Sequence, residues 1–371
     1  ELTIQEAALL AALPAAPSRL APTDNLAEAQ ARAANVLAAM REDIVLPGRK
    51  LVINVSIGTV ISDTVSDDIE SLMVKADLAI YAAKGKGKAA VVQFHDRMDI
   101  EYQRRQQLKG DLRQAIANGD ITLVYQSIFD PRSNRIVGCE ALARWTHPEY
   151  GPISPAVFIP IAEESGIITD LTRMVLTMAT RDCSTWPGQT TVAVNVSARD
   201  FRSGGVEAMV LAALEQSGLP PHRLEIEVTE TTVIEERTAA TAVLSAIRAR
   251  GVGVALDDFG TGYSSLSYLR ALPLTKLKID RSFVVDIETN PQAQRLLANV
   301  AQLGKDIDLS ITVEGVETEG QLNLLVSQTR IDQVQGFVYG QPLGLDAMTQ
   351  LLLAAHPAPT GKIAKRAVAR R

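Results

Sequence analysis

Between residues 121 and 355, short apolar runs alternate with helical stretches, and this alternation constrains the fold more than any other feature. Runs of β-branched and small apolar residues bounded by turn residues are typical of buried strands. We predict such strands at residues 122–129, 135–142, 191–196, 223–228, 253–256, 276–279, 309–313 and 333–338. Strands that alternate with helices over this length favour a parallel α/β fold, specifically a (β/α)8 TIM-like barrel.

The first two predicted strands differ from the rest. They flank D-P-R-S-N at residues 130–134, and the composition of this segment is that of a tight turn. A turn this short joins antiparallel strands, whereas parallel strands need a longer crossover connection. We therefore expect an irregular barrel in which one strand runs antiparallel.

Composition disfavours several other kinds of protein. The chain has 371 residues and a net charge of -6, which does not favour binding to nucleic acid. Its 2 cysteines are too few for a disulfide framework, and its 4 scattered histidines disfavour a zinc site. The sequence contains no long apolar run and does not begin like a signal peptide, so we expect no membrane span and a cytoplasmic location.

Polar or acidic residues recur where the predicted strands end. In a parallel barrel these ends meet on the face that carries active sites. Taken singly, each residue could be a helix cap, a rim hydrogen bond or a surface charge. Taken together, their carboxylates would repel one another strongly unless metal ions lay among them. The residues are Glu140, Asn195, Glu227, Glu230, Asp257, Asp258, Lys278, Asp280, Glu314 and Gln335.

Asp257 and Asp258 stand side by side in G-V-G-V-A-L-D-D-F-G-T-G-Y, after a predicted strand and before a glycine-rich turn. Buried together they would repel each other and lose hydration, and a bound cation removes both costs. The alternative is a solvated turn that opens a helix. Oxygen ligands without histidine favour Mg²⁺ or Mn²⁺, and adjacent carboxylates suggest two ions with one bridging group.

Such a pair of ions activates water and neutralises phosphoryl oxygens, and Lys278 could orient or deprotonate that water. The residues therefore indicate a metal-dependent phosphoester hydrolase. Enolate chemistry, which also uses carboxylates, Mg²⁺ and lysine, stays open on these grounds.

Motifs across residues 106–355 narrow the choice. They are L-V-Y-Q-S-I, G-C-E-A-L-A-R-W, H-P-E-Y-G-P-I-S-P, F-I-P-I-A-E, V-N-V-S, E-V-T-E, D-D-F-G-T-G-Y-S-S-L, L-K-I-D and V-E-G-V-E. This set resembles the EAL domain, a phosphodiesterase family that opens cyclic di-GMP. The departures are Ser127, where the family usually has proline, and Gln341, where a basic residue often precedes Pro342. Neither departure replaces a metal ligand.

The resemblance implies a role for each site residue. Glu140, Asn195, Glu227 and Asp257 would hold one ion, and Asp257, Asp258 and Glu314 would hold the other. Lys278 would position the attacking water, and Gln335 would lie at the water and the substrate. Leu142, Arg144 and Pro342 would contact the substrate. Glu230 would support the loop of residues 258–265, which in the family couples the metal site to a dimer interface, so the resemblance also implies a homodimer through the barrel.

The N-terminal part resembles pieces of other families. Residues 1–40 resemble the end of the glycosyltransferase domain of penicillin-binding proteins, through E-L-T-I-Q-E-A-A-L-L-A-A-L-P-A-A-P-S-R. Residues 41–98 resemble the C-terminal half of a GGDEF domain, through I-N-V-S-I-G and A-D-L-A-I-Y-A-A-K-G-K-G-K, and the G-G-D-E-F signature is missing. We further predict a connecting helix at 99–118, the barrel at 119–355 and a basic disordered tail at 356–371.

We therefore predict a Mg²⁺- or Mn²⁺-dependent phosphodiesterase that converts cyclic di-GMP to linear pGpG. The first alternative is a module that senses cyclic di-GMP without cutting it and signals to a partner. The second is an inactive fusion product, whose residues 1–98 would be insoluble or rapidly degraded.

Overall fold

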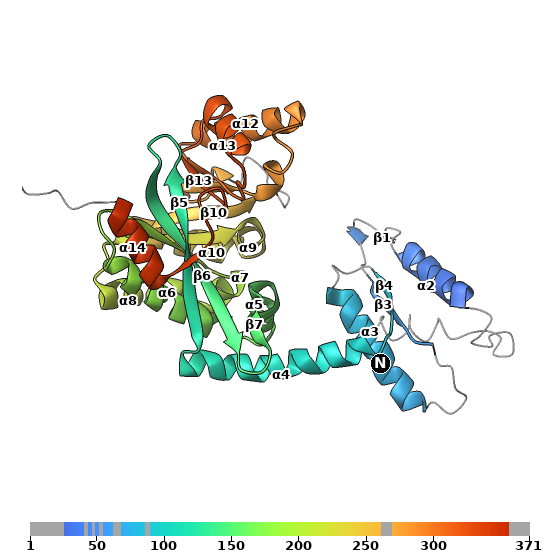
Figure 1. The fold of residues 1–371 in the computed structure, drawn as a ribbon. Helices are drawn as coiled ribbons and strands as arrows, with labels where there is room; N and C mark the ends of the chain where they lie inside the picture. Colours follow the sequence, from blue (N-terminus) through green and yellow to red (C-terminus); the bar gives the residue numbers. More distant parts are fainter. Residues whose placement is uncertain are drawn as a thin grey trace, which may run out of the picture. The chain divides into compact units, whose positions relative to one another are not determined.

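A computed structural model of the chain describes residues 26–40, 44–46, 49–51, 55–61, 68–85, 90–260 and 269–355. The chain divides into two compact units, residues 1–110 and 111–371 (Figure 1). The predicted glycosyltransferase-like tail up to residue 25, and the predicted disordered tail at 356–371, lie outside the described residues.

The first unit contains short strands and longer helices. Its elements are α2 (Leu26–Met40), β1 (Ile44–Leu46), β2 (Arg49–Leu51), β3 (Ile57–Thr59), α3 (Ile69–Gly85), β4 (Val91–Gln93) and the first part of α4 (Arg97–Asn118). β1 pairs antiparallel with β2, and β3 pairs parallel with β4. A small core of Ala79, Ala83, Val92 and Met98 lies between α3, β4 and the start of α4.

The second unit is built on a closed barrel. Its strands are β5 (Ile121–Asp130), β6 (Arg135–His147), β8 (Thr191–Asn195), β9 (Leu224–Thr229), β10 (Gly253–Phe259), β11 (Lys276–Ile279), β12 (Ser310–Val313) and β13 (Gln333–Gln335). The strands from β6 and β8 through β13 pair parallel with their neighbours, while β5 pairs antiparallel with both β6 and β13 and closes the barrel. The (β/α)8 prediction and its one antiparallel strand are both confirmed.

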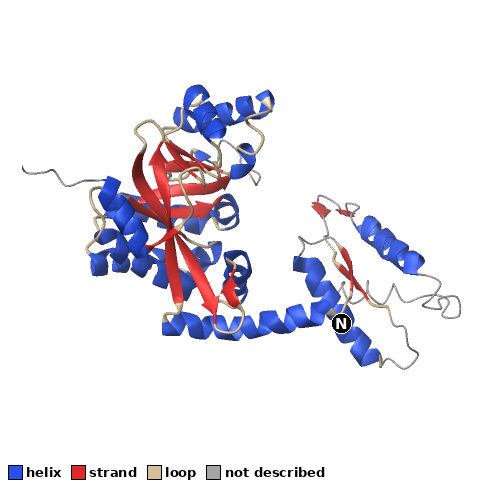
Figure 2. Cartoon of the chain, viewed as in Figure 1, coloured by secondary structure: helices blue, strands red, loops and turns tan. Residues whose placement is uncertain are grey.

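Helices surround the barrel (Figure 2). They are α5 (Pro155–Glu164), α6 (Ile168–Ser184), α7 (Ala198–Ser203), α8 (Val206–Ser217), α9 (Glu230–Glu235), α10 (Arg237–Ala249), α12 (Pro291–Asp306), α13 (Glu319–Gln328) and α14 (Leu345–Ala355), with 3-10 turns η2 (Pro221–Arg223) and η3 (Arg281–Phe283). Two short strands, β7 (Gly151–Ile153) and β14 (Leu343–Gly344), add to β6 and β5. Within the described ranges, none of the helices has both the length and the apolar character needed to cross a membrane.

Three strands differ by three or more residues from their predicted ranges. β10 continues to Phe259, beyond its predicted end at residue 256. β6 continues to His147, because the hairpin with β5 keeps pairing up to Trp145 opposite Ile121 and β7 pairs with its end. β13 stops at Gln335 because the next residue, Gly336, packs against backbone: a Cβ there would lie 2.1 Å from the carbonyl oxygen of Val316.

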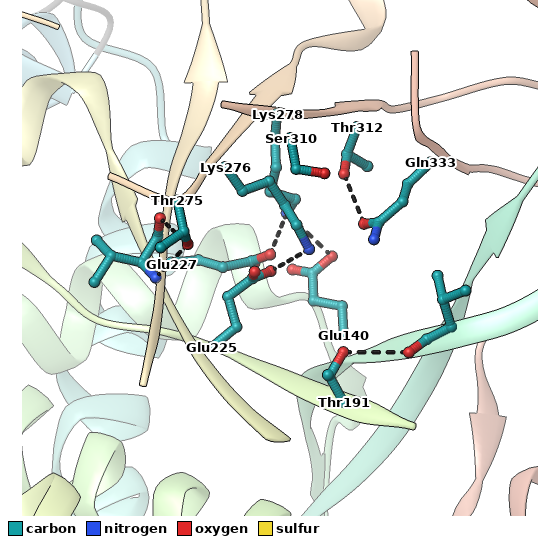
Figure 3. Close-up of polar contacts among 12 residues, drawn as sticks. Glu140, Thr191, Glu225, Glu227, Thr275, Lys276, Lys278, Ser310, Thr312 and Gln333 are labelled. Carbon is teal, nitrogen blue, oxygen red and sulfur yellow. Dashed lines mark hydrogen bonds and ion pairs between the residues drawn. The ribbon is translucent and has the colours of Figure 1, made fainter. Parts of the chain in front are cut away.

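The strands β9 and β11 alternate between an apolar outer face and a polar inner face. Outer residues such as Ile226, Val228 and Leu277 are fully buried against the helices. The intervening residues of the same strands are polar and lie inside the barrel, where Figure 3 shows several of them close together. Because side chains alternate along a strand, this pattern places the charged residues of β9 and β11 in the barrel interior.

Candidate active site

Five of the seven carboxylates predicted at the strand ends come together at one rim of the barrel, whereas Glu230 and Asp280 lie outside this cluster and Asp280 caps η3. Glu140, Glu227 and Asp257 each offer a carboxylate oxygen within 4.8 Å of the others. Asp257, Asp258 and Glu314 form a second such group, with Asp257 common to both. The structure therefore brings together the two carboxylate sets that the resemblance implied, supplied by β6, β9, β10 and the residue after β12.

Asp257 and Asp258 reach the same rim because the end of β10 is irregular. Neighbouring residues of a regular strand point to opposite faces. The register between β10 and β11 shifts between Leu256 and Phe259, and Asp258 adopts a positive φ of 53°. The amide of Asp258 donates to Asp257 Oδ1 over 2.9 Å. This irregularity lets two consecutive carboxylates share one cluster.

Lys278 lies at the centre of the cluster, with its side chain only 1% exposed. Its Nζ is 2.6 Å from Glu314 Oε1 and 2.8 Å from Glu227 Oε1. It is also 3.2 Å from Asp257 Oδ1 and 3.6 Å from Glu140 Oε2. Burial disfavours the ammonium form, but the four carboxylates together raise the pKa of Lys278 well above its ordinary value.

Two amides hold Glu140. Asn195 Nδ2 donates to Glu140 Oε1 at 2.8 Å and to Glu227 Oε2 at 3.3 Å. Gln335 Nε2 donates to Glu140 Oε2 at 2.6 Å and to Gln126 Oε1 at 3.1 Å. Gln126 was missed from the sequence, because only the pairing of β5 with β6 places it opposite Glu140.

The carboxylates of the cluster differ in how readily they ionise. Burial raises the pKa of Glu227 and of Glu314, and the neighbouring carboxylates raise both pKa values further. The positive charge of Lys278 lowers them, but only in part. Burial, together with Asp257, likewise raises the pKa of Asp258. Burial also opposes ionisation of Glu140, yet Lys278 and the two amides hold its pKa below the ordinary value.

The donor set fits hard divalent cations. When all five carboxylates are ionised, they and the one ammonium carry four net negative charges, which two divalent ions would balance. Two carboxylate oxygens, Glu227 Oε1 and Glu314 Oε1, are buried. Both lie close to Lys278 Nζ, but neither accepts a hydrogen bond of suitable geometry. Carboxylate oxygens without histidine or cysteine are the ligands that Mg²⁺ and similar ions prefer.

The remaining predicted residues lie around this cluster. Leu142 and Arg144 are half-buried and follow Glu140 at alternate positions of β6, so they lie on the same face of that strand. Arg144 Nη1 donates to the carbonyl oxygen of Ala143 at 2.9 Å. Pro342 is half-buried and precedes β14.

Glu230 lies at the start of α9 and is buried. Its Oε2 accepts from the amide of Gly260 at 3.4 Å. Most of the loop that Glu230 was predicted to support, residues 261–268, lies outside the described residues. Of the two departures from the family pattern, Ser127 is buried in β5 and Gln341 is exposed.

Comparison with known families agrees with this geometry. The EAL domain matches residues 109–342, which is more than half of the chain. The chain belongs to the EAL-domain family. A second family, the diguanylate cyclase GGDEF domain, matches residues 19–90. The GGDEF match includes residues 19–40, which belong to the segment predicted to resemble a glycosyltransferase tail. The comparisons do not show such a tail.

Individual relatives of this EAL-domain chain cover most of its length. A bifunctional diguanylate cyclase/cyclic di-GMP phosphodiesterase, MucR of Pseudomonas aeruginosa, is 37% identical over 295 residues, covering 78% of this chain and 43% of MucR. An uncharacterized protein of Sinorhizobium fredii is 38% identical over 326 residues, covering 88% of this chain and 39% of that protein. The chain thus spans less than half the length of these relatives.

Solved structures match the EAL barrel. The PaMucR phosphodiesterase in complex with c-di-GMP has a TM-score of 0.62 and 38% identity, and the match covers 65% of this chain and 99% of that one. The EAL domain of Mycobacterium smegmatis DcpA has a TM-score of 0.55 and 30% identity, covering 63% of this chain and 98% of that one.

Proposed function

We propose that this EAL-domain chain hydrolyses one phosphodiester bond of cyclic di-GMP and releases linear pGpG. The observation that carries the proposal is the pair of carboxylate groups that share Asp257 at the rim of the barrel. The name of MucR and the c-di-GMP complex of the PaMucR phosphodiesterase support this choice of substrate. In the reaction, a water molecule loses a proton and its oxygen bonds to phosphorus, while the bond from phosphorus to the 3′ oxygen breaks and the 3′ oxygen takes up a proton.

Two Mg²⁺ or Mn²⁺ ions are the proposed cofactors. Glu140, Asn195, Glu227 and Asp257 would hold one ion, and Asp257, Asp258 and Glu314 the other. When bound, such ions lower the pKa of a water molecule and neutralise phosphoryl oxygens. Asn195 would turn its amide oxygen to the ion, since its Nδ2 already donates to Glu140 and Glu227.

The other roles belong to the side chains of the chain itself. Lys278 reaches four of the carboxylates, so its ammonium group would orient the attacking water among them. Gln335 donates to Glu140 Oε2 and would lie at the water and the substrate. Arg144 would bind a phosphate oxygen, and Leu142 and Pro342 would contact the rest of the dinucleotide.

The domain limits and the oligomeric state are also proposals. We infer a catalytic barrel at residues 119–355, joined through α4 to a partial GGDEF-like unit. That unit lacks the G-G-D-E-F sequence, so we expect no cyclase activity from it. We propose a homodimer through the barrel, which sedimentation of the purified chain would test.

The test of the function is an assay of cyclic di-GMP hydrolysis with Mn²⁺ and with a chelator. We expect pGpG with Mn²⁺, none with the chelator, and none from Glu140→Ala. The matched control is Asp170→Asn, which removes an exposed carboxylate of α6 that pairs only at the surface with Arg173. Tight binding without product would favour the sensor alternative, and full activity in Glu140→Ala would refute the site.

A further inference from the structure

A second buried ion pair spans the barrel interior next to the carboxylate cluster. Lys276 Nζ lies 2.7 Å from Glu225 Oε1, and the two side chains are 8% and 11% exposed. Neither residue belongs to the groups that could hold metal ions. Figure 3 shows the Glu225–Lys276 pair beside the contact of Lys278 with Glu227. Burying two charges costs free energy of desolvation, so the presence of this buried pair needs an explanation.

The two ion pairs repeat one arrangement. Glu225 and Glu227 are alternate residues of β9, and Lys276 and Lys278 are alternate residues of β11, so all four side chains lie inside the barrel. The strand β10 lies between β9 and β11. Both pairs therefore cross β10, one at each of two successive levels of the barrel.

The inner face of β10 leaves room for these crossings. Its residues at these levels are Gly253 and Ala255, which pair in register with Glu225 and Glu227. A Cβ on Gly253 would lie 3.3 Å from Glu225 Oε2 and 3.4 Å from Glu225 Cβ. A larger side chain on either residue would occupy the space that the long charged side chains use.

Each lysine has a competing carboxylate within reach. Residues two apart on a strand are about 6.6 Å apart, roughly the length of a lysine side chain. Lys278 could therefore turn from the rim towards Glu225 if Glu225 had no other partner. A buried unpaired carboxylate is strongly unfavourable, so it would draw the nearest ammonium group.

We propose that Glu225 and Lys276 are a positioning pair, in which Lys276 occupies Glu225 so that Lys278 stays directed at the rim carboxylates. The inference rests on the proposed hydrolysis, because the pair acts on the reaction through Lys278. It makes no contact of its own with the substrate or with the reacting atoms.

The variant Lys276→Met tests this role in the full chain. Lys278 should turn to the unpaired Glu225, so kcat should fall about 10-fold or more with little change in KM. The rim would lose a competing cation, so its affinity for Mn²⁺, measured by calorimetry, should rise about 10-fold. General damage to the fold would lower that affinity instead.

The double variant Glu225→Gln/Lys276→Met removes the competing carboxylate together with its partner. Lys278 then has no reason to leave the rim, so kcat and Mn²⁺ affinity should return to near the values of the parent chain. The control is Tyr125→Phe, which removes a buried hydrogen bond of 2.7 Å to Asp182 and should lower the melting temperature without changing Mn²⁺ affinity.

Unchanged kcat and Mn²⁺ affinity in Lys276→Met would overturn the proposal, and so would a double variant that stays impaired while folding like its parent. If Lys276→Met does not fold, kcat and Mn²⁺ affinity of the double variant alone test the proposal. A parent chain that binds Mn²⁺ but releases no pGpG would refute the hydrolysis, while the order of the three Mn²⁺ affinities would still test the pair.

Discussion

At the scale of single residues, Lys278 links the charges of the site. Its Nζ approaches four carboxylates that come from four different places in the sequence. In the absence of metal ions it is the only cation among the residues that form the described cluster. It thus does part of what the ions would do, which is to offset repulsion among buried carboxylates.

We predict that Lys278→Met destabilises the chain without metal ions and increases the stabilisation that Mn²⁺ gives. In chelator, the variant should lose about 3–5 kcal/mol of unfolding free energy, because buried carboxylates lose their counter-charge. Saturating Mn²⁺ should raise its melting temperature by more than it raises that of the parent chain, because the ions bind the folded state without a competing ammonium. Differential scanning calorimetry in both conditions measures this.

The control for that experiment is Arg173→Met. Arg173 pairs with Asp170 on the exposed surface of α6, where the two side chains are 57% and 61% exposed. Such surface pairs contribute little to stability. The idea fails if Mn²⁺ stabilises Lys278→Met less than it stabilises the parent chain.

At the scale of elements, backbone hydrogen bonds join the loop after β12 to the loop after β13 at the rim. The amide of Val316 donates to the carbonyl oxygen of Gln335 at 3.2 Å, and the amide of Val338 donates to that of Val316 at 3.0 Å. Gly336 allows this contact, since a Cβ on it would lie 2.1 Å from the oxygen and 2.4 Å from the nitrogen of Val316. The contact fixes Gln335 relative to Glu314, two residues before Val316.

We therefore predict that Gly336→Ala separates these loops. It should cost about 3 kcal/mol, the upper end for overpacking, because the clash is with backbone rather than with a mobile side chain. It should also slow hydrolysis by displacing Gln335. Urea denaturation and initial rates measure the two effects.

Gly344→Ala is the matched control, because a Cβ on Gly344 would meet nothing within 4 Å. It should leave stability nearly unchanged. Equal losses in the two variants would mean that the contact between Gly336 and Val316 does not hold the loops together.

At the scale of the whole molecule, the two units differ in how much core their described residues form. The described cluster between α3, β4 and the start of α4 contains two alanines, a valine and a methionine, and the described strands of the first unit form only two-stranded sheets. Small units with two-stranded sheets bury too little surface to be stable alone. The second unit has a closed barrel covered by helices.

We predict that residues 97–371 unfold in one cooperative thermal transition and that isolated residues 26–110 show none. Circular dichroism of the two fragments checks this. A cooperative melt of the shorter fragment would show that its core is larger than its described residues indicate.

Local patterns in the sequence were enough to predict much of the fold and many of the site residues. Strand and helix positions follow from apolar periodicity and capping residues, which act over a few neighbours. Acidic residues at successive strand ends predicted a shared rim, because parallel strands in a barrel end on one face. The residues Glu140, Glu227, Asp257 and Glu314 were identified in this way, and the structure brings them together.

Only the tertiary structure decided the contacts that depend on register between distant strands. The pairing of β5 with β13 closes the barrel and brings Gln126 to Gln335. The shift at the end of β10 turns Asp258 to the side of Asp257. Glu225 and Lys276 were not predicted from the sequence, because their pairing across β10 depends on the order of the strands. Register arises from packing between residues far apart in the chain, so a local pattern does not contain it.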